Sequence, residues 1–159
     1  MVPARSAFTH VLDSGRFWTH IEEQIKANAQ MAIEKCRPLS GIDFGYNRES
    51  VEWLEGYIER LRQSGKLQDE ITRVKLVNVF GSFLGECIVR CYGGTWTQRE
   101  SDWCVAFDGR NAVHPFSKVA KQMEHGGEDG IGGFFKLIPE VFWNCLGLPP
   151  PAWDLTPKP

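Results

Sequence analysis

The sequence predicts an α+β fold with three N-terminal helices, a small antiparallel meander of two or three strands, and two C-terminal helices. Three observations carry this prediction. Between residues 16 and 92, apolar side chains recur every three or four positions over long stretches, which is the spacing of amphipathic helices. Short β-prone runs separated by turn residues follow, up to residue 114. Two further segments then return to a helical pattern.

The chain is long enough to form one domain with a hydrophobic core. Its 159 residues lie near the commonest domain size, so we assign residues 1–147 to a single domain, of which residues 1–12 form a weakly patterned arm. Residues 148–159 form a C-terminal tail that holds five of the nine prolines. Proline fixes φ and favours extended chain, so we expect this tail to run over the surface, held to the body by Trp153.

The first expected helix begins near residue 16 and ends near Cys36. Its apolar positions lie at steps of three and four residues: Phe17, Trp18, Ile21, Ile25, Ala29, Ala32 and Ile33. The helix should stop there because Pro38 disfavours helical geometry at Arg37.

The second expected helix lies in NRESVEWLEGYIERLRQSG, residues 47–65. Asn47 is placed to cap its start, and Gly65 is placed to end it. One face is apolar and the opposite face is charged. The apolar face holds Val51, Leu54, Ile58 and Leu61, and the charged face holds Glu52, Glu55, Glu59 and Arg62.

The third expected helix begins near Gln68 and ends at the pair Gly93 and Gly94. It is apolar over a wide arc between residues 77 and 89, so we expect it to be the central and most buried helix. Gly81 and Gly85 lie four residues apart on it and form a gap in its side chains. We interpret this gap as a place where another helix or the sheet approaches closely.

The runs TWTQ, DWCVAF and NAVH are expected to be the strands of the meander, joined by turns at RES and DGR. Alternation along the second run places Trp103, Val105 and Phe107 on one face, which should pack on the helices. Pro115 suits the first turn of a helix that reaches Glu124. The last expected helix covers residues 130–145, with a break or restart at Pro139.

The composition argues against several classes of function. The chain has 18 Lys and Arg against 20 Asp and Glu, and no basic block of the kind that follows a phosphate backbone, so we expect no nucleic-acid partner. The N-terminus lacks the apolar core of a signal peptide, and no run approaches the ~18 to 20 apolar residues that span a bilayer. We therefore expect a cytoplasmic protein without a membrane partner.

Five cysteines form an odd set without the spacing of a disulfide framework: Cys36, Cys87, Cys91, Cys104 and Cys145. We expect reduced thiols, most of them buried. Cys87 and Cys91 share a helix face and could join other Cys or His residues in a zinc site, but this spacing is not typical of zinc ribbons or fingers. No histidine adjoins any of these thiols to activate it. We therefore predict neither a metal nor a cofactor, and no catalytic residue.

Glu86 is the most notable polar residue of the third helix. A carboxylate in such an apolar segment would have a raised pKa if it were unpaired, which is how general acids and bases are tuned. However, Arg90 lies four residues further on the same helix face and can pair with it. We favour a structural role, with Glu86 at least partly buried and bonded to Arg90 or to main-chain donors in the meander.

The segments SVEWLEGYIERLR, LVNVFGSFLGECIVRCYGGTW and HPFSKVAKQMEHGGEDGIGGFF together resemble a family of small bacterial proteins of unknown function. That family shares an LG-x-x-LGE helix, followed by a GG-x-W strand, and a later P-x-x-K-V-x-K helix. The resemblance covers roughly residues 44–136. It implies a bacterial origin, a compact α+β domain and an intracellular setting, and it carries no catalytic residue onto this chain. Small acidic domains of this kind are similar to immunity proteins, which neutralise a toxin from a neighbouring cell.

Three functions remain open. The first is a non-catalytic protein-binding domain, such as an immunity or adaptor protein, whose acidic surface binds a basic toxin domain through Glu49, Glu52, Trp53, Glu55 and Glu59. The alternative is a small-ligand-binding or enzymatic domain with a pocket at Glu86, Arg90, Trp96 and Trp103, where Glu86 faces the cavity and Arg90 turns away. The third is a self-associating protein that exposes an apolar stripe on the first or the last helix.

Overall fold

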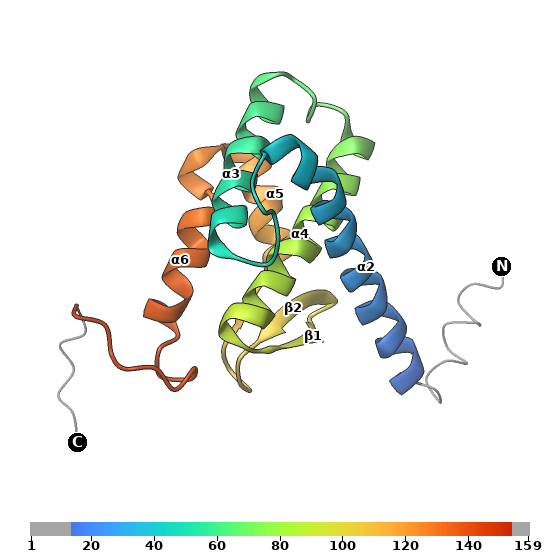
Figure 1. The fold of residues 1–159 in the computed structure, drawn as a ribbon. Helices are drawn as coiled ribbons and strands as arrows, with labels where there is room; N and C mark the ends of the chain where they lie inside the picture. The colour runs from blue at the N-terminus through green and yellow to red at the C-terminus, as the bar shows by residue number, and fades with distance from the viewer. Residues whose placement is uncertain (1–13, 154–159) are drawn as a thin grey trace.

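The structure of the protein is a computed structural model that describes residues 14–153, with side chains from residue 20 onward. These residues form five α-helices, a short 3-10 helix and one three-stranded antiparallel sheet. The order of the elements confirms the predicted α+β fold. Helix α4 runs through the middle of the molecule, and the sheet lies beside its C-terminal end (Figure 1).

Helix α2, Ser14–Ser40, contains Pro38 and runs four residues past the predicted end at Cys36. The prediction of the end point was wrong because the last turn has its own support. The Ser40 hydroxyl donates to the Arg37 carbonyl at 3.1 Å, and the Arg37 guanidinium donates to the Phe44 carbonyl at 2.9 Å. The first bond satisfies a carbonyl that the helix end otherwise leaves open, and the second ties the last turn to the loop that follows it.

Helix α3, Arg48–Gln63, begins and ends as predicted. The Asn47 side chain accepts a bond from the Ser50 amide at 2.9 Å, which is an N-cap. Gly65 follows the helix with φ +78°, and the Lys66 amide donates back to the Leu61 carbonyl at 3.2 Å. This arrangement is a Schellman motif, which favours glycine at the left-handed position.

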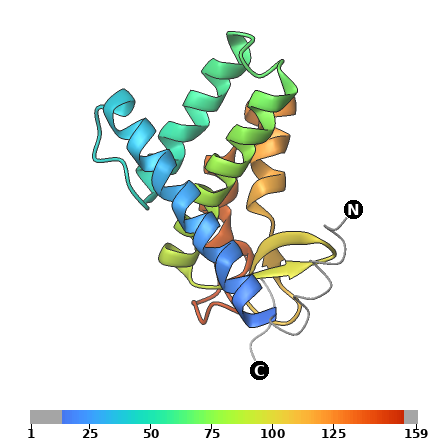
Figure 2. The same ribbon diagram turned by 90° about the vertical axis from the view of Figure 1, so that its right-hand side faces the viewer.

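Helix α4, Glu70–Tyr92, packs against both α2 and α5 (Figures 1 and 2). Residues 80–88 are all buried, which confirms a central position for this part of the helix. A side chain at Gly81 would collide with Phe116 of α5, and one at Gly85 would collide with the Trp96 ring. The two glycines therefore admit a helix and the sheet, as the sequence predicts.

The sheet has the strand order β1 (Thr95–Arg99), β2 (Asp102–Ala106) and β3 (Ala112–Val113). Trp96 lies opposite Val105 in the β1–β2 register, so both side chains point to the same face. Val105 is buried, and Trp103 and Phe107 pack partly buried against the core. The predicted apolar face of the second strand is confirmed.

Helix α5, Pro115–His125, leads through a 3-10 turn, Gly127–Asp129, to helix α6, Ile131–Val141. Pro115 occupies the first turn of α5 as predicted. Pro139 lies inside α6 without interrupting it, and the helix ends at Val141 rather than at Cys145. Trp153 is 59% exposed, so the expectation that it holds the tail to the body was wrong.

None of the described helices is both long enough and apolar enough to cross a membrane.

Candidate functional site

Helix α3 carries the predicted acidic surface, and its first turns hold the two carboxylates that face solvent. Glu49 and Glu52 are both exposed. The Arg48 guanidinium donates to the Glu52 carboxylate at 2.9 Å, with more than half of each side chain in solvent. An exposed ion pair of this kind contributes little to stability, so it leaves Glu52 accessible to a competing partner.

Trp53 is half-buried rather than fully presented to solvent. Its ring meets Phe44 edge-on, with 5.6 Å between centroids, and stacks on Tyr57 at 5.1 Å. The Arg60 guanidinium lies 5.5 Å from the Trp53 centroid. Trp53 is therefore fixed in a stack of aromatic and Arg side chains, which keeps its orientation without an entropy cost on binding.

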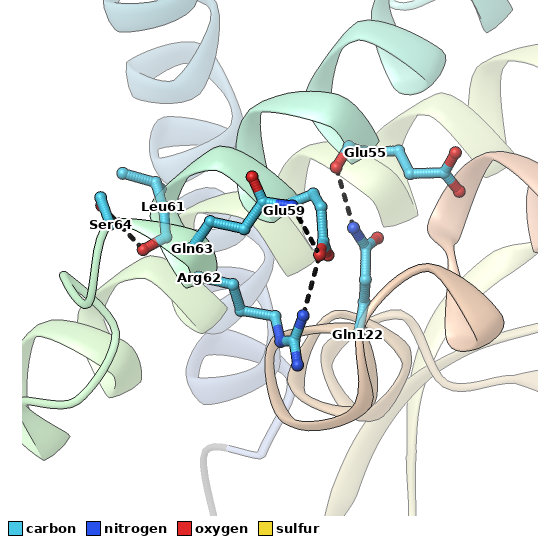
Figure 3. A network of polar contacts seen from close by, with 7 residues as sticks. All are labelled: Glu55, Glu59, Leu61, Arg62, Gln63, Ser64 and Gln122. Carbon is cyan, nitrogen blue, oxygen red and sulfur yellow. Dashed lines mark hydrogen bonds and ion pairs between the residues drawn. The ribbon is translucent and has the colours of Figure 1, made fainter.

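Glu55 points into the contact between α3, α5 and α6 (Figure 3). Its carboxylate accepts the Gly132 amide at 3.0 Å, and its carbonyl accepts the Gln122 side-chain amide at 2.9 Å. The other end of Gln122, which is fully buried, accepts the Ile131 amide at 3.0 Å. Glu55 and Gln122 thus satisfy the open amides at the start of α6 and dock that helix on α3.

The Glu59 carboxylate also accepts hydrogen bonds from its own chain. One carboxylate oxygen accepts from Arg62 at 2.8 Å and lies 3.5 Å from the Gln63 amide nitrogen (Figure 3). The other oxygen is buried and has no hydrogen-bond partner among the described residues. Glu55 therefore docks α6 on α3, Glu59 bonds to residues of α3 itself, and Glu49 and Glu52 remain as the exposed acidic pair.

Gln122 is a key residue of this network that the sequence reasoning did not identify. One signal in the sequence could have identified Gln122: it is a polar residue between Val119 and Met123 on the buried face of an amphipathic helix. A buried amide needs partners for both its donor and its acceptor, which here are the backbones of two different helices.

Glu86 is 2% exposed and both of its oxygens are occupied. The Trp96 indole donates to one oxygen at 2.8 Å, and the Arg90 guanidinium approaches the other at 3.4 Å. Arg90 also lies over the Tyr46 ring, 3.9 Å from its centroid. The predicted burial and the pairing with Arg90 are confirmed, while the donor from the meander is a side chain instead of the main chain.

This geometry bears on the alternative pocket. That function requires Glu86 to face a cavity with Arg90 turned away, whereas Arg90 is turned toward Glu86. Trp96 and Trp103 do line a hollow of about 400 Å³, together with Glu22, Thr97 and Gln98. With one oxygen bonded to the buried Trp96 indole and the other to the half-exposed Arg90, the Glu86 carboxylate is placed as a structural acceptor.

The thiols lie mostly inside the fold. Cys36, Cys87 and Cys104 are buried, Cys145 is half-buried and Cys91 is exposed. Burial raises the pKa of Cys36 to about 11 and raises the pKa of Cys87 as well. Among the described residues, no group of three or more His, Cys, Asp or Glu side chains could hold a metal ion.

A groove between α5 and α6 is lined largely by apolar side chains. It encloses about 390 Å³. Two of its apolar residues remain largely in solvent, Leu137 at 50% and Val141 at 56% exposure. Its lining, which we call the α5–α6 groove, is Ala112, Val113, His114, Ser117, Lys118, Lys121, Phe134, Leu137, Ile138, Val141 and Phe142.

The charged side chains that line the α5–α6 groove are all basic. Lys118 lies 5.7 Å from the Phe134 centroid and 3.5 Å from Asp129, which itself lies outside the lining. Lys121 is exposed and makes no ion pair with any residue that the structure describes. From the sequence, an exposed apolar stripe on the last helix was predicted only as the mark of a self-associating protein, and the apolar spacing along α6 does not show that α5 forms a groove beside that stripe.

The chain matches no protein-family model, no curated protein sequence and no solved structure. The resemblance to a family of small bacterial proteins therefore stays a prediction. The functional inference depends on the geometry of the surface alone.

Proposed function

We propose that this chain is a non-catalytic protein-binding domain that binds its partner in the α5–α6 groove. The observation that supports this proposal is the uncovered apolar side of α6, where Leu137 and Val141 are each at least half exposed. Contiguous apolar surface of this kind costs free energy in water and marks interaction sites. The two residues lie four positions apart, so they form one ridge on the helix.

The shape of the groove suits a helix from the partner. Phe134, Leu137 and Val141 follow one another along α6 at steps of three and four residues, and α5 supplies the second wall. An amphipathic helix places its own apolar residues at the same steps, so it can lie along such a groove. Lys121 at the rim then favours a partner with a carboxylate beside its apolar face.

A pair of aspartate substitutions tests this function. Leu137→Asp places a charge on the exposed ridge of α6, and Leu39→Asp places one on α2, where Leu39 is 62% exposed and outside the groove. Proteins captured from the native cell by the unmodified chain should still be captured by L39D and be lost with L137D. Equal capture by both variants, each checked for an unchanged thermal unfolding curve, would overturn the proposal.

A second candidate surface is the start of α3, where Glu49 and Glu52 are exposed beside the Trp53 stack. It suits a basic partner such as a cationic toxin domain, and an immunity or adaptor role in a bacterial cytoplasm. Because long-range attraction speeds association, the rate of binding to this surface should fall with added salt and with Glu49→Lys and Glu52→Lys. These variants leave the α5–α6 groove intact, so they separate the two surfaces.

A further inference from the structure

A second groove, between α4 and α5, lies on a different face and has a different charge pattern. It encloses about 600 Å³. Its apolar walls come from Leu67, from Val74 and Val77 of α4, and from Ala120 and Met123 of α5. Val74 is 54% exposed, and Ile71, one turn earlier on α4, is 67% exposed. The N-terminal part of α4 therefore presents apolar side chains to solvent beside an open groove.

The rim of this α4–α5 groove carries one charge of each sign. Arg73 comes from α4 and Glu124 comes from α5. Arg73 donates to the Leu67 carbonyl at 2.8 Å and makes no ion pair with a described residue. Glu124 is 74% exposed, and its neighbour His125, at 3.8 Å, bears a charge only when protonated. Neither charge makes a permanent ion pair within the described chain, although hydrogen bonds and, less strongly, the nearby Arg73 lower the pKa of the Asp69 carboxyl.

We propose that the α4–α5 groove is a two-fold interface with a second copy of this chain. A two-fold axis along the groove places α4 of one copy opposite α5 of the other, at the same height. Arg73 of each copy then faces Glu124 of its mate, which forms two equivalent ion pairs. Val74 and Ile71 of each copy cover the apolar groove of the other. Such an interface is isologous, because one patch serves both copies.

The charge pattern is what favours a second copy as the occupant. A patch with one cation and one anion on opposite walls complements itself after a two-fold rotation. The α5–α6 groove does not complement itself in this way. Its lining charges are Lys118 and Lys121, which would face lysines of the second copy. The two grooves therefore have separate roles, one for a partner and one for self-association.

A charge exchange within one chain tests this inference. The molar mass of the intact protein is measured over a concentration series by sedimentation or light scattering. Arg73→Glu or Glu124→Arg alone places like charges opposite each other, so we expect each to weaken dimerisation by roughly tenfold or more. The double variant R73E/E124R restores both pairs and should recover the dissociation constant to within about threefold of the starting value.

Two further variants distinguish association through this groove from non-specific association. Val74→Asp should also weaken the dimer, whereas Leu39→Asp, at a position of α2 that is also more than half exposed, should leave it unchanged. Far-UV spectra and unfolding curves confirm that each variant folds. A monomer at every concentration up to about 1 mM, which corresponds to a binding free energy of only about −4 kcal/mol, would overturn the inference. The inference would also be overturned if the double variant dimerised no more tightly than the single variants, or if Val74→Asp left the dissociation constant of the dimer unchanged.

Discussion

The two halves of α4 are both rich in apolar residues but have opposite surroundings. Residues 80–88 are buried without exception. In residues 70–79, by contrast, Ile71 and Val74 are exposed at 67% and 54%. The difference is in what covers each half: the later half faces α5 and the sheet, and the earlier half borders the open α4–α5 groove.

Small residues explain why the C-terminal half is covered so completely. Gly81 and Gly85 let Phe116 and the Trp96 ring approach the helix backbone, which larger side chains would prevent. Close approach also buries Glu86 and brings the Trp96 indole within hydrogen-bond distance of it. The N-terminal half has no glycine, so its apolar side chains stand out from the helix and remain available for another molecule.

The largest predicted change in the free energy of unfolding concerns Glu86, in the buried half of α4. Glu86→Ala leaves the buried Trp96 indole without its acceptor, and we expect it to lower the free energy of unfolding by about 2 to 4 kcal/mol. Equilibrium denaturation in urea measures this change. Glu86→Gln keeps an acceptor for Trp96 and should cost less than half as much. A loss below about 0.5 kcal/mol for the alanine variant would contradict the burial of Glu86.

The sequence was sufficient to predict the element order and most of the helix ends. Local chemistry explains this success: the Asn47 cap and the positive φ of Gly65 depend on neighbouring residues alone. The two helix ends that were predicted wrongly both involve proline. Pro38 and Pro139 lie in the last turn of their helices, where each removes one backbone hydrogen bond and only two helical residues follow.

The surfaces were harder to predict than the fold. The sequence shows that Glu55 and Glu59 lie on the charged side of α3, but only the tertiary structure shows α5 and α6 packed against that side. The exposed apolar residues of α4 and α6 were hard to predict for the same reason. An amphipathic pattern indicates that a face is apolar, and it does not indicate whether the chain itself or another molecule covers that face.

Two glycine substitutions should change the stability by smaller amounts, one lowering it and the other raising it. Gly85→Ala adds a methyl group that collides with the Trp96 ring, so we expect a loss of about 1 to 3 kcal/mol from overpacking. Gly133→Ala in α6 meets nothing within 4 Å and should stabilise the helix by about 0.4 to 1 kcal/mol. Thermal unfolding of both variants provides the comparison. Equal effects at the two positions would show that Trp96 does not pack closely on α4.

The smallest effect on folding is expected in the exposed half. Ile71→Ser and Val74→Ser change side chains that are more than half in solvent, so the monomer should unfold within about 0.5 kcal/mol of the unmodified chain. Denaturation is measured at low protein concentration, where association does not contribute. The matched change Ile88→Ser, in the buried half, should cost several times more. Similar losses at residues 71 and 88 would refute the contrast between the halves.

Hydrogen exchange of the α4 amides, followed at several protein concentrations, tests the difference between the halves most directly. Amides of residues 80–88 should exchange only through global unfolding, which is slow even in dilute protein and slower still at concentrations where a dimer stabilises the native state. Amides of residues 71–79 should exchange faster in dilute protein and slow down as the concentration rises, because a second copy covers them. Equal rates in both halves, unchanged over the concentration series, would contradict the assignment of one half to the core and the other to an interface.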